Sequence, residues 1–199
     1  MARILVSGIA TRDIVNYVDH YPAEDEKMRA TEQHIRLGGN AANTAMVLAQ
    51  LGHKIDFLGT ISTDETGDAL IREMNAGGVM TTYCPRVAGS TPTSYITLNR
   101  QNGSRTIVHY RDLAEISIAD FPFDQLADYD WLHFEGRNVD ITLEILAAIR
   151  SRHLNITISV EIEQERGGIE ELSDYADIVL FSSAYARSLG FKKAQEFLP

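Results

Sequence analysis

The sequence predicts an α/β fold in which helices flank a mainly parallel sheet and a small second sheet is appended. From residue 40 onward, helical and strand-like patterns alternate, which is typical of parallel sheets covered on both faces. Short apolar runs such as ILVSGI, residues 4–9, are typical of buried strands. Other segments alternate apolar and polar residues without intervening helices, which predicts an antiparallel appendage. These segments are 12–19, 28–36, 92–99 and 105–110.

The first half of the chain begins with the strand at 4–9, and the acidic, turn-like stretch YPAEDEKMR at 21–29 separates the first two alternating segments. A helix is expected over 41–51 because its apolar residues recur at helical spacing. Gly52 is placed to end that helix. A strand follows at 54–61. The next helix, 64–77, has an acidic first turn and glycines at its end, as capping rules require.

The second half is expected to continue the alternation. Asn102-Gly103 is a strong hairpin signal between the strands 93–98 and 105–110. The remaining expected strands are 81–84, 130–135, 155–161 and 178–181, and the remaining helices are 139–153, 168–175 and 184–189.

Composition narrows the class of protein. The 199 residues carry a net charge of −10, so the excess of Lys and Arg that neutralises nucleic acid or an anionic membrane is missing. No apolar run approaches the roughly 18 residues of a membrane span, and no leader pattern precedes the first strand. Cys84 is the only cysteine, so a reducing, cytoplasmic location is expected. We expect Cys84 to be a half-buried structural residue in a strand.

The stretch RLGGNAANTA, residues 36–45, carries the strongest chemical signal. Adjacent glycines let a backbone approach a ligand closely, and a helix N-terminus offers free amides. Asn40 and Asn43 lie one turn apart, and two amide side chains suit a ligand with many hydroxyls. The pattern therefore favours sugar-like recognition, since neither GxGxxG nor a P-loop is present. An ordinary helix cap by Asn40, with a tight turn at the glycines, fits this stretch equally well.

Asp13 favours the sugar-binding interpretation over an ordinary helix cap. It follows the first strand in GIATRD, at the carboxyl end where open parallel sheets bind ligands. A carboxylate at this place accepts hydrogen bonds from two sugar hydroxyls. The appended strands are suited to cover such a site and to exclude water from it.

Several stretches in order resemble one family. GGNAANTAMVLAQLGHKIDFLGTIS is similar to the first signature of the ribokinase-like (PfkB) carbohydrate kinases. DIVNYVDHYPAEDEKMR, GSRTIVHYRDL, WLHFEGRN, SVEIE and YARSLGF resemble the ketohexokinase (fructokinase) branch of that family. The resemblance covers residues 3 to about 195. It implies a ribokinase-like three-layer α/β/α domain, with lid strands inserted at about 12–36 and 92–110.

The resemblance implies roles for single residues. Sugar-binding positions of the family fall on residues of the first 45, which are Asp13, Gly38, Gly39, Asn40 and Asn43. Asp25 matches a lid acid that reaches the sugar of the partner subunit, and Arg105 matches an arginine that contacts nucleotide phosphates. Glu135 would lie at the sugar site, with Arg137 and Asn138 in the same EGRN segment. His109 and Tyr110 fit lid packing better than chemistry.

The activity implied is transfer of the γ-phosphoryl group of ATP, with Mg²⁺, to a hydroxyl of a ketohexose such as fructose. A homodimer through the lid strands is implied as well. The family's catalytic base belongs to a glycine-rich GAGD turn that does not occur in residues 1–199. We therefore expect this chain to be the N-terminal two-thirds of the domain and inactive alone. The residues that organise Mg²⁺ stay open, with Glu161 and Glu163 as candidates through water.

Two alternatives remain at this point. The chain fits a truncated, non-catalytic protein that binds sugar or dimerises, because the lid residues would serve either role. It also fits another member of the family that acts on a sugar, a sugar acid or a nucleoside.

Overall fold

The computed structural model describes residues 1–197, and its largest layer is a six-stranded sheet in which all strands are parallel. The strand order is β12-β11-β10-β1-β4-β6. The bounds are β1 Arg3–Ser7, β4 Lys54–Leu58, β6 Val79–Met80, β10 Trp131–Glu135, β11 Thr157–Ile162 and β12 Ile178–Phe181. The apolar runs seen in the sequence thus form buried parallel strands, as predicted.

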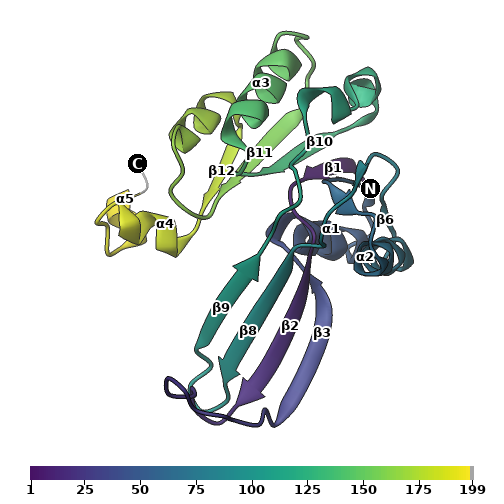
Figure 1. Ribbon diagram of the computed structural model, residues 1–199. Helices are drawn as coiled ribbons and strands as arrows, with labels where there is room; N and C mark the ends of the chain where they lie inside the picture. The colour runs from purple at the N-terminus through teal and green to yellow at the C-terminus, as the bar shows by residue number, and fades with distance from the viewer. Residues whose placement is uncertain (198–199) are drawn as a thin grey trace.

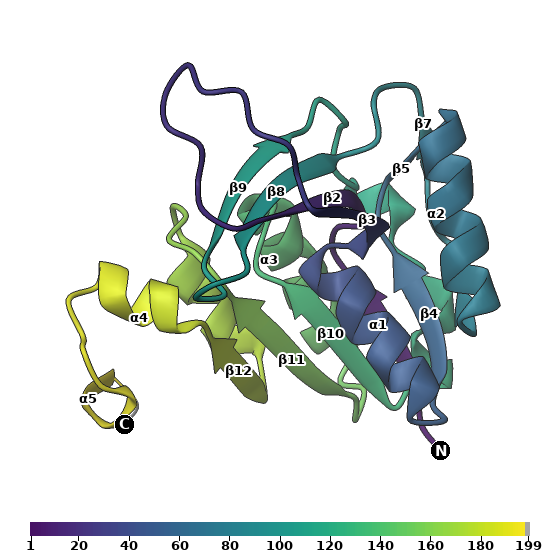
Figure 2. The same ribbon diagram turned by 90° about the horizontal axis from the view of Figure 1, so that it is seen from below.

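Helices cover both faces of this sheet, which confirms the three-layer prediction (Figure 1). One face packs against α1 (Asn40–Gln50) and α2 (Glu65–Ala76), where alanines of α1 bring the helix close to Val6 and Phe57. The other face packs against α3 (Val139–Arg150) and the 3₁₀ helix η3 (Ile169–Tyr175), around Leu132 and Leu146. Figure 2 shows α1 lying along β10 and β4 when the molecule is seen from below.

The second sheet, here called the lid sheet, extends away from the central sheet as a tongue (Figure 1). Its order is β3-β2-β8-β9. The bounds are β2 Thr11–Val18, β3 Glu32–Gly38, β8 Thr93–Asn99 and β9 Arg105–Tyr110. The prediction of a purely antiparallel appendage was wrong. Two antiparallel hairpins meet along a parallel β2–β8 pair, because both strands start at the central sheet and run outward.

Short elements connect these layers. They are β5 Ile61–Ser62, β7 Arg86–Val87, η1 Ile118–Asp120, η2 Phe123–Asp128, α4 Ser183–Ser188 and α5 Ala194–Phe197. β5 pairs in parallel with β7. Among the described residues, no helix combines the length and the apolar character needed to cross a membrane.

The predicted strand at 81–84 is absent. The strand in this region is β6, two residues long, and the chain then turns, with the amide of Cys84 donating to the carbonyl of Thr81. Cys84 is nevertheless buried, 9% exposed, and its thiol donates to the carbonyl of Phe57. Burial raises the pKa of the Cys84 thiol to about 12, which fits a structural role.

Residues 168–175, expected as an α-helix, form the 3₁₀ helix η3, which begins after Gly168 in a left-handed conformation (φ 72°). The hairpin at Asn102-Gly103 is confirmed, with Gly103 at φ 73°. The remaining helices and strands lie within a few residues of the expected ranges. The differences at element ends are those of fraying and capping.

Candidate functional site

The mouth of helix α1 lies at the carboxyl ends of the central strands, close to the root of the lid sheet (Figure 1). Gly39 precedes the helix at φ 94°, a conformation that favours glycine. A Cβ at this position would lie 2.3 Å from the carbonyl oxygen of Ile9. The glycine therefore allows the loop after β1 to touch the helix mouth.

Asp13 and Gly38 are diagonal neighbours on the β2–β3 pair at the lid root, where Gly38 lies opposite Thr11. A Cβ added to Gly38 would lie 2.2 Å from Cγ and Oδ1 of Asp13 and 2.3 Å from Oδ2. Only glycine leaves room for the Asp13 carboxylate in this position. Oδ1 accepts a hydrogen bond from the hydroxyl of Thr11 at 2.9 Å, which orients the carboxylate. The structure thus brings together two residues that are 25 positions apart in the sequence.

Glu135 ends β10 and is 7% exposed. Its Oε2 accepts from the amide of Ile9 at 2.9 Å and from the amide of Ala41 at 3.3 Å. Its Oε1 accepts from Arg137 at 3.1 Å. Both oxygens are therefore committed to the protein, and Glu135 holds the end of β1 against the first turn of α1.

Asn40 does not cap helix α1 with its side chain. Gly39 occupies the cap position, and the side-chain amide of Asn40 donates instead to Oε1 of Glu161 at 3.2 Å. The expected cap by Asn40 is thus wrong, because the carboxylate of Glu135 takes the amide of Ala41. Asn40 and the exposed Asn43 line one groove of about 760 Å³ between α1 and the strands β10 to β12.

The floor of this groove combines a carboxylate and a histidine with unusual pKa values. Burial, with the carboxylates of Glu135 and Glu163 nearby, raises the pKa of Glu161 to about 7. Burial lowers the pKa of His133 to about 4. His133 Nδ1 pairs with the hydroxyl of Ser159 at 2.8 Å, which also accepts from the indole of Trp131.

Arg105 and Asp25 lie away from this cluster. The register places Arg105 in a row with Tyr17 and Asp13 in a row with His109, so Arg105 is about 13 Å further out on the same face. Asp25 is exposed in the loop between β2 and β3, at φ 64°, beyond the outer end of the sheet. Within one chain, the structure does not bring Arg105 or Asp25 to Asp13.

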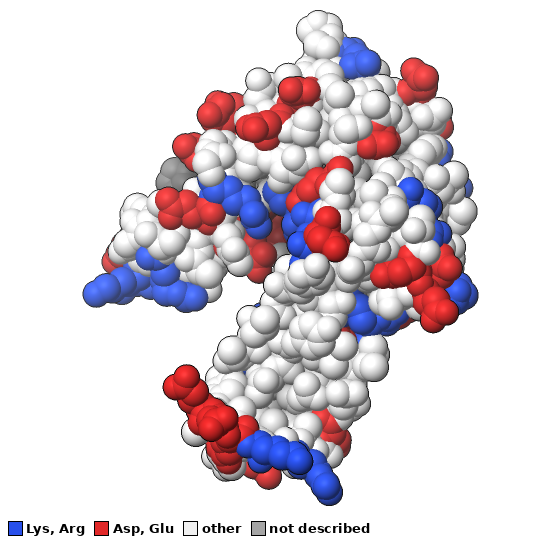
Figure 3. Space-filling model, in the orientation of Figure 1, with Lys and Arg blue, Asp and Glu red and all other residues white. Residues whose placement is uncertain are grey.

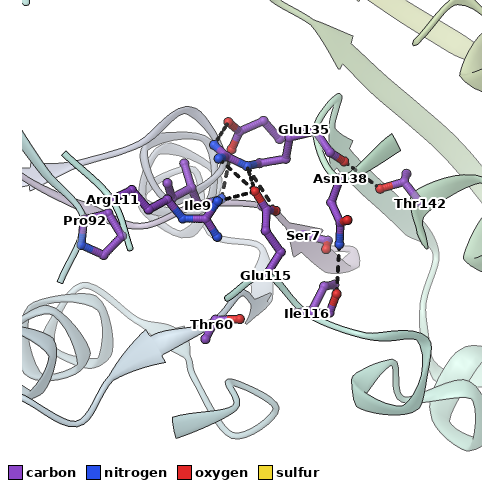
Figure 4. A pocket seen from close by; sticks show the side chains of 12 residues that line it. Ser7, Ile9, Thr60, Pro92, Arg111, Glu115, Ile116, Glu135, Asn138 and Thr142 are labelled. Carbon is purple, nitrogen blue, oxygen red and sulfur yellow. Dashed lines mark hydrogen bonds and ion pairs between the residues drawn. The ribbon is translucent and has the colours of Figure 1, made fainter. Parts of the chain in front are cut away.

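Sequence reasoning missed a chain of ion pairs behind the site (Figure 4). Arg137 donates from Nε and from its terminal nitrogen to Glu115 at 3.0–3.2 Å, and Arg111 pairs with the same carboxylate. Glu115 lies in an irregular segment, so no periodic pattern marked it. Arg111 and Glu115 are four residues apart, a spacing that predicts an ion pair in a helix. This segment was not predicted to be helical, so the spacing did not indicate a contact.

Residues 1–197 contain no group of three His, Cys, Asp or Glu side chains arranged to hold a metal ion. Glu135 is bound by amides and a guanidinium, which leaves Glu161 and Glu163 without a third ligand. Mg²⁺ at kinase sites is bound by one or two carboxylates together with water and phosphate oxygens, so the role of Glu161 and Glu163 through water stays a prediction.

Comparisons with known proteins point to one family. Residues 1–193 match the model of the pfkB family carbohydrate kinases. The chain is 35% identical to ketohexokinase of Mus musculus over 204 residues, which covers 98% of this chain and 68% of that protein. It is 30% identical to ribokinase of Bacillus subtilis over 109 residues, 54% of this chain and 37% of that protein.

Solved structures agree on the fold. Ribokinase from Giardia lamblia matches with a TM-score of 0.84 at 16% identity, covering 98% of this chain and 63% of that one. Ribokinase from Thermotoga maritima matches with a TM-score of 0.75 at 24% identity, covering 100% and 65%. The chain thus spans about two thirds of the length of these relatives. With its ribokinase-like fold and the family match over residues 1–193, this chain belongs to the pfkB family of carbohydrate kinases.

Proposed function

We propose that this chain supplies the acceptor-sugar site and the lid of an ATP-dependent sugar kinase that acts on a ketohexose such as fructose. The observation that carries the proposal is the close contact of Asp13 with Gly38. The Asp13 carboxylate accepts from the hydroxyl of Thr11 at the lid root and lies against Gly38, where any side chain would displace it. The 35% identity to ketohexokinase supports the ketose as the substrate class.

The chemistry of the site follows from its donors and acceptors. The Asp13 carboxylate accepts from two sugar hydroxyls, and the oxygen and nitrogen of the Asn40 and Asn43 amides accept and donate. Gly38 and Gly39 let the backbone approach the ring. Glu135 serves this site by fixing the loop after β1 to the mouth of α1, rather than by a free carboxylate.

ATP and Mg²⁺ enter the proposal through the family. Arg105 is exposed on the Asp13 face of the lid sheet, and its match to the family's arginine supports a contact with a nucleotide phosphate. The described residues hold no cluster of three metal-ligating side chains, so the proposal keeps Glu161 and Glu163 as candidates that organise Mg²⁺ through water.

We propose further that two copies pair through their lid sheets. Tyr95 and Val108 share one row of the sheet with Ile35 and Ile14, on the face opposite Asp13. Ile35, Tyr95 and Val108 are 60%, 51% and 66% exposed. Figure 3 shows a lid whose shaft carries few charges and whose far end carries many. Such an apolar row suits a second copy, and Asp25 at the far end would then face the partner's site.

A thermal-shift panel on this chain tests the substrate class. D-Fructose, D-ribose, D-gluconate and adenosine are added at increasing concentration, and a bound ligand raises Tm by mass action. We expect fructose to give the largest shift. A larger shift with ribose, gluconate or adenosine would assign another substrate of the family, and no shift with any of them would remove the sugar site.

A further inference from the structure

Four alternating charges connect the lid to the mouth of helix α1. They are Arg111, Glu115, Arg137 and Glu135, in this order (Figure 4). Arg111 is the first residue after strand β9, so it is joined directly to the lid sheet. Glu135 ends strand β10 and accepts the amides of Ile9 and Ala41, so it belongs to the floor of the site.

Each hydrogen bond between these four residues is charge-assisted. Glu115 accepts three hydrogen bonds from Arg137 at 3.0–3.2 Å and pairs with Arg111 through Oε1. Arg137 then donates to Glu135 at 3.1 Å. The side chains of Arg111, Glu115 and Arg137 are only 19%, 26% and 15% exposed, so water screens these pairs weakly.

The electrostatics support a permanently charged link. Burial would raise the pKa of Glu115, but the two guanidiniums hold it below its ordinary value. Burial would lower the pKa of Arg137, but Glu115 and Glu135 together raise it. Without the charge of Glu115, Arg111 and Arg137 would face each other as two half-buried cations.

The hydrogen bonds at the Arg111 end of this row of charges are incomplete. The four charged residues line a cavity of about 20 Å³, next to the hydroxyl of Thr60. Within residues 1–197, this hydroxyl and the Nε of Arg111 have no hydrogen-bond partner. Arg111, at one end of the row of four charges, is therefore held by fewer hydrogen bonds than Glu135 at the other end. Both carboxylate oxygens of Glu135 accept from protein donors.

We propose that Glu115 is a positioning residue that couples the lid to the floor of the sugar site. When the lid lies as in this structure, Glu115 holds Arg137, and Arg137 holds Glu135 against the amides of Ile9 and Ala41. When Arg111 moves away with the lid, Arg137 loses its fixed orientation, and the hold on both amides weakens. This inference rests on the proposed function only for the identity of the sugar. The coupling between the lid and the amides of Ile9 and Ala41 does not depend on it.

Amide hydrogen exchange measured by NMR tests the link without any ligand. Glu115→Gln removes the charge and keeps the shape. We expect the amides of Ile9 and Ala41 to exchange about tenfold faster in this variant, since their acceptor loses its support. Asp112→Asn is the matched control, because the side chain of Asp112 binds Ser90 and Tyr110 at the same lid root rather than any of the four charges. It should change these two amides by less than about twofold.

Glu115→Asp keeps the charge on a shorter side chain and should give an intermediate rate, which also serves if the glutamine variant folds poorly. Unchanged exchange at Ile9 and Ala41 in folded Glu115→Gln would overturn the proposal, and so would an equal effect of Asp112→Asn. A fructose titration of the same samples separates the two claims. If the wild-type chain binds no fructose while the exchange responds to Glu115→Gln, the proposed function fails and the coupling stands.

Discussion

The six-stranded central sheet and the four-stranded lid sheet are stabilised in different ways. In the central sheet, residues such as Leu132 and Val160 are fully buried beneath α3 and η3. In the lid sheet, every residue of β9 is exposed, and on the face opposite Asp13 the side chains of Ile35 and Tyr95 are 60% and 51% exposed. Buried apolar area therefore stabilises the central sheet, whereas strand pairing and contacts at its root stabilise the lid. This difference leaves the lid with the exposed surface that our proposals assign to a sugar and to a second copy.

The largest expected effect is a difference in unfolding free energy between a variant of the central sheet and a variant of the lid sheet. Leu132→Ala leaves a cavity in a layer with 0% exposure and should cost about 3–4 kcal/mol of unfolding free energy. Val108→Ala, at 66% exposure in the lid, should cost less than about 0.5 kcal/mol. Urea unfolding of both variants at a concentration that keeps the chain monomeric measures the difference. Equal losses would mean that the lid has a core of its own.

The second effect concerns the place where the two sheets meet. Gly38→Ala puts a methyl group where the Asp13 carboxylate lies, so fructose affinity should fall at least about a hundredfold, or about 2.7 kcal/mol. Gly167→Ala is the control, because nothing lies within 4 Å of a Cβ there and the position has no positive φ. Isothermal titration calorimetry measures both. Full affinity in folded Gly38→Ala would show that Asp13 does not bind the sugar.

The third effect belongs to the groove beside α1. Glu161 has a pKa of about 7 in the folded chain, above its ordinary 4.5, so the folded state binds more protons than the unfolded state between these values. Stability contributed by its protonated form is present below pH 4.5 and is lost as the pH rises through 7. Glu161→Gln should thus gain about 1 kcal/mol at pH 8, reduced by solvent screening, and nothing near pH 4.5.

Denaturant unfolding of both proteins at the two pH values tests this. A variant that is less stable than the wild type at pH 8 would mean that the hydrogen bond from Asn40 outweighs the charge repulsion.

The smallest effect is expected at the outer lid. Arg105→Gln should change fructose affinity by less than about twofold, because Arg105 lies about 13 Å from the Asp13 row. Calorimetry with fructose alone measures this. A loss as large as that expected for Gly38→Ala would extend the sugar site along the lid.

The fold and the mouth of helix α1 could be predicted from the sequence, because buried strands and glycines before a helix are recognised from neighbouring residues. It did not carry the partners of Asn40 and Glu135, since both are set by contacts across roughly a hundred residues of chain. The hydroxyl-binding roles of Asp13 and Asn43 stay predictions. Glu115 was missed because irregular segments have no period from which a contact with Arg137 could be read.

The parallel β2–β8 pair was missed for a related reason. Alternation within a strand shows which residues share a face, but the direction of the neighbouring strand depends on where both strands leave the central sheet. The resemblance to a family supplied what local patterns lacked, namely the order of motifs along the chain.

The central claim is that the lid root of this chain binds a sugar through Asp13. Isothermal titration with D-fructose tests it on three proteins: the wild-type chain, Asp13→Asn, and Asp19→Asn as a control in which an exposed carboxylate just beyond β2 is neutralised. The account predicts saturable binding to the wild type and to Asp19→Asn, and affinity at least about tenfold weaker for folded Asp13→Asn. Equal binding by all three proteins, or no binding by the wild type, would contradict it.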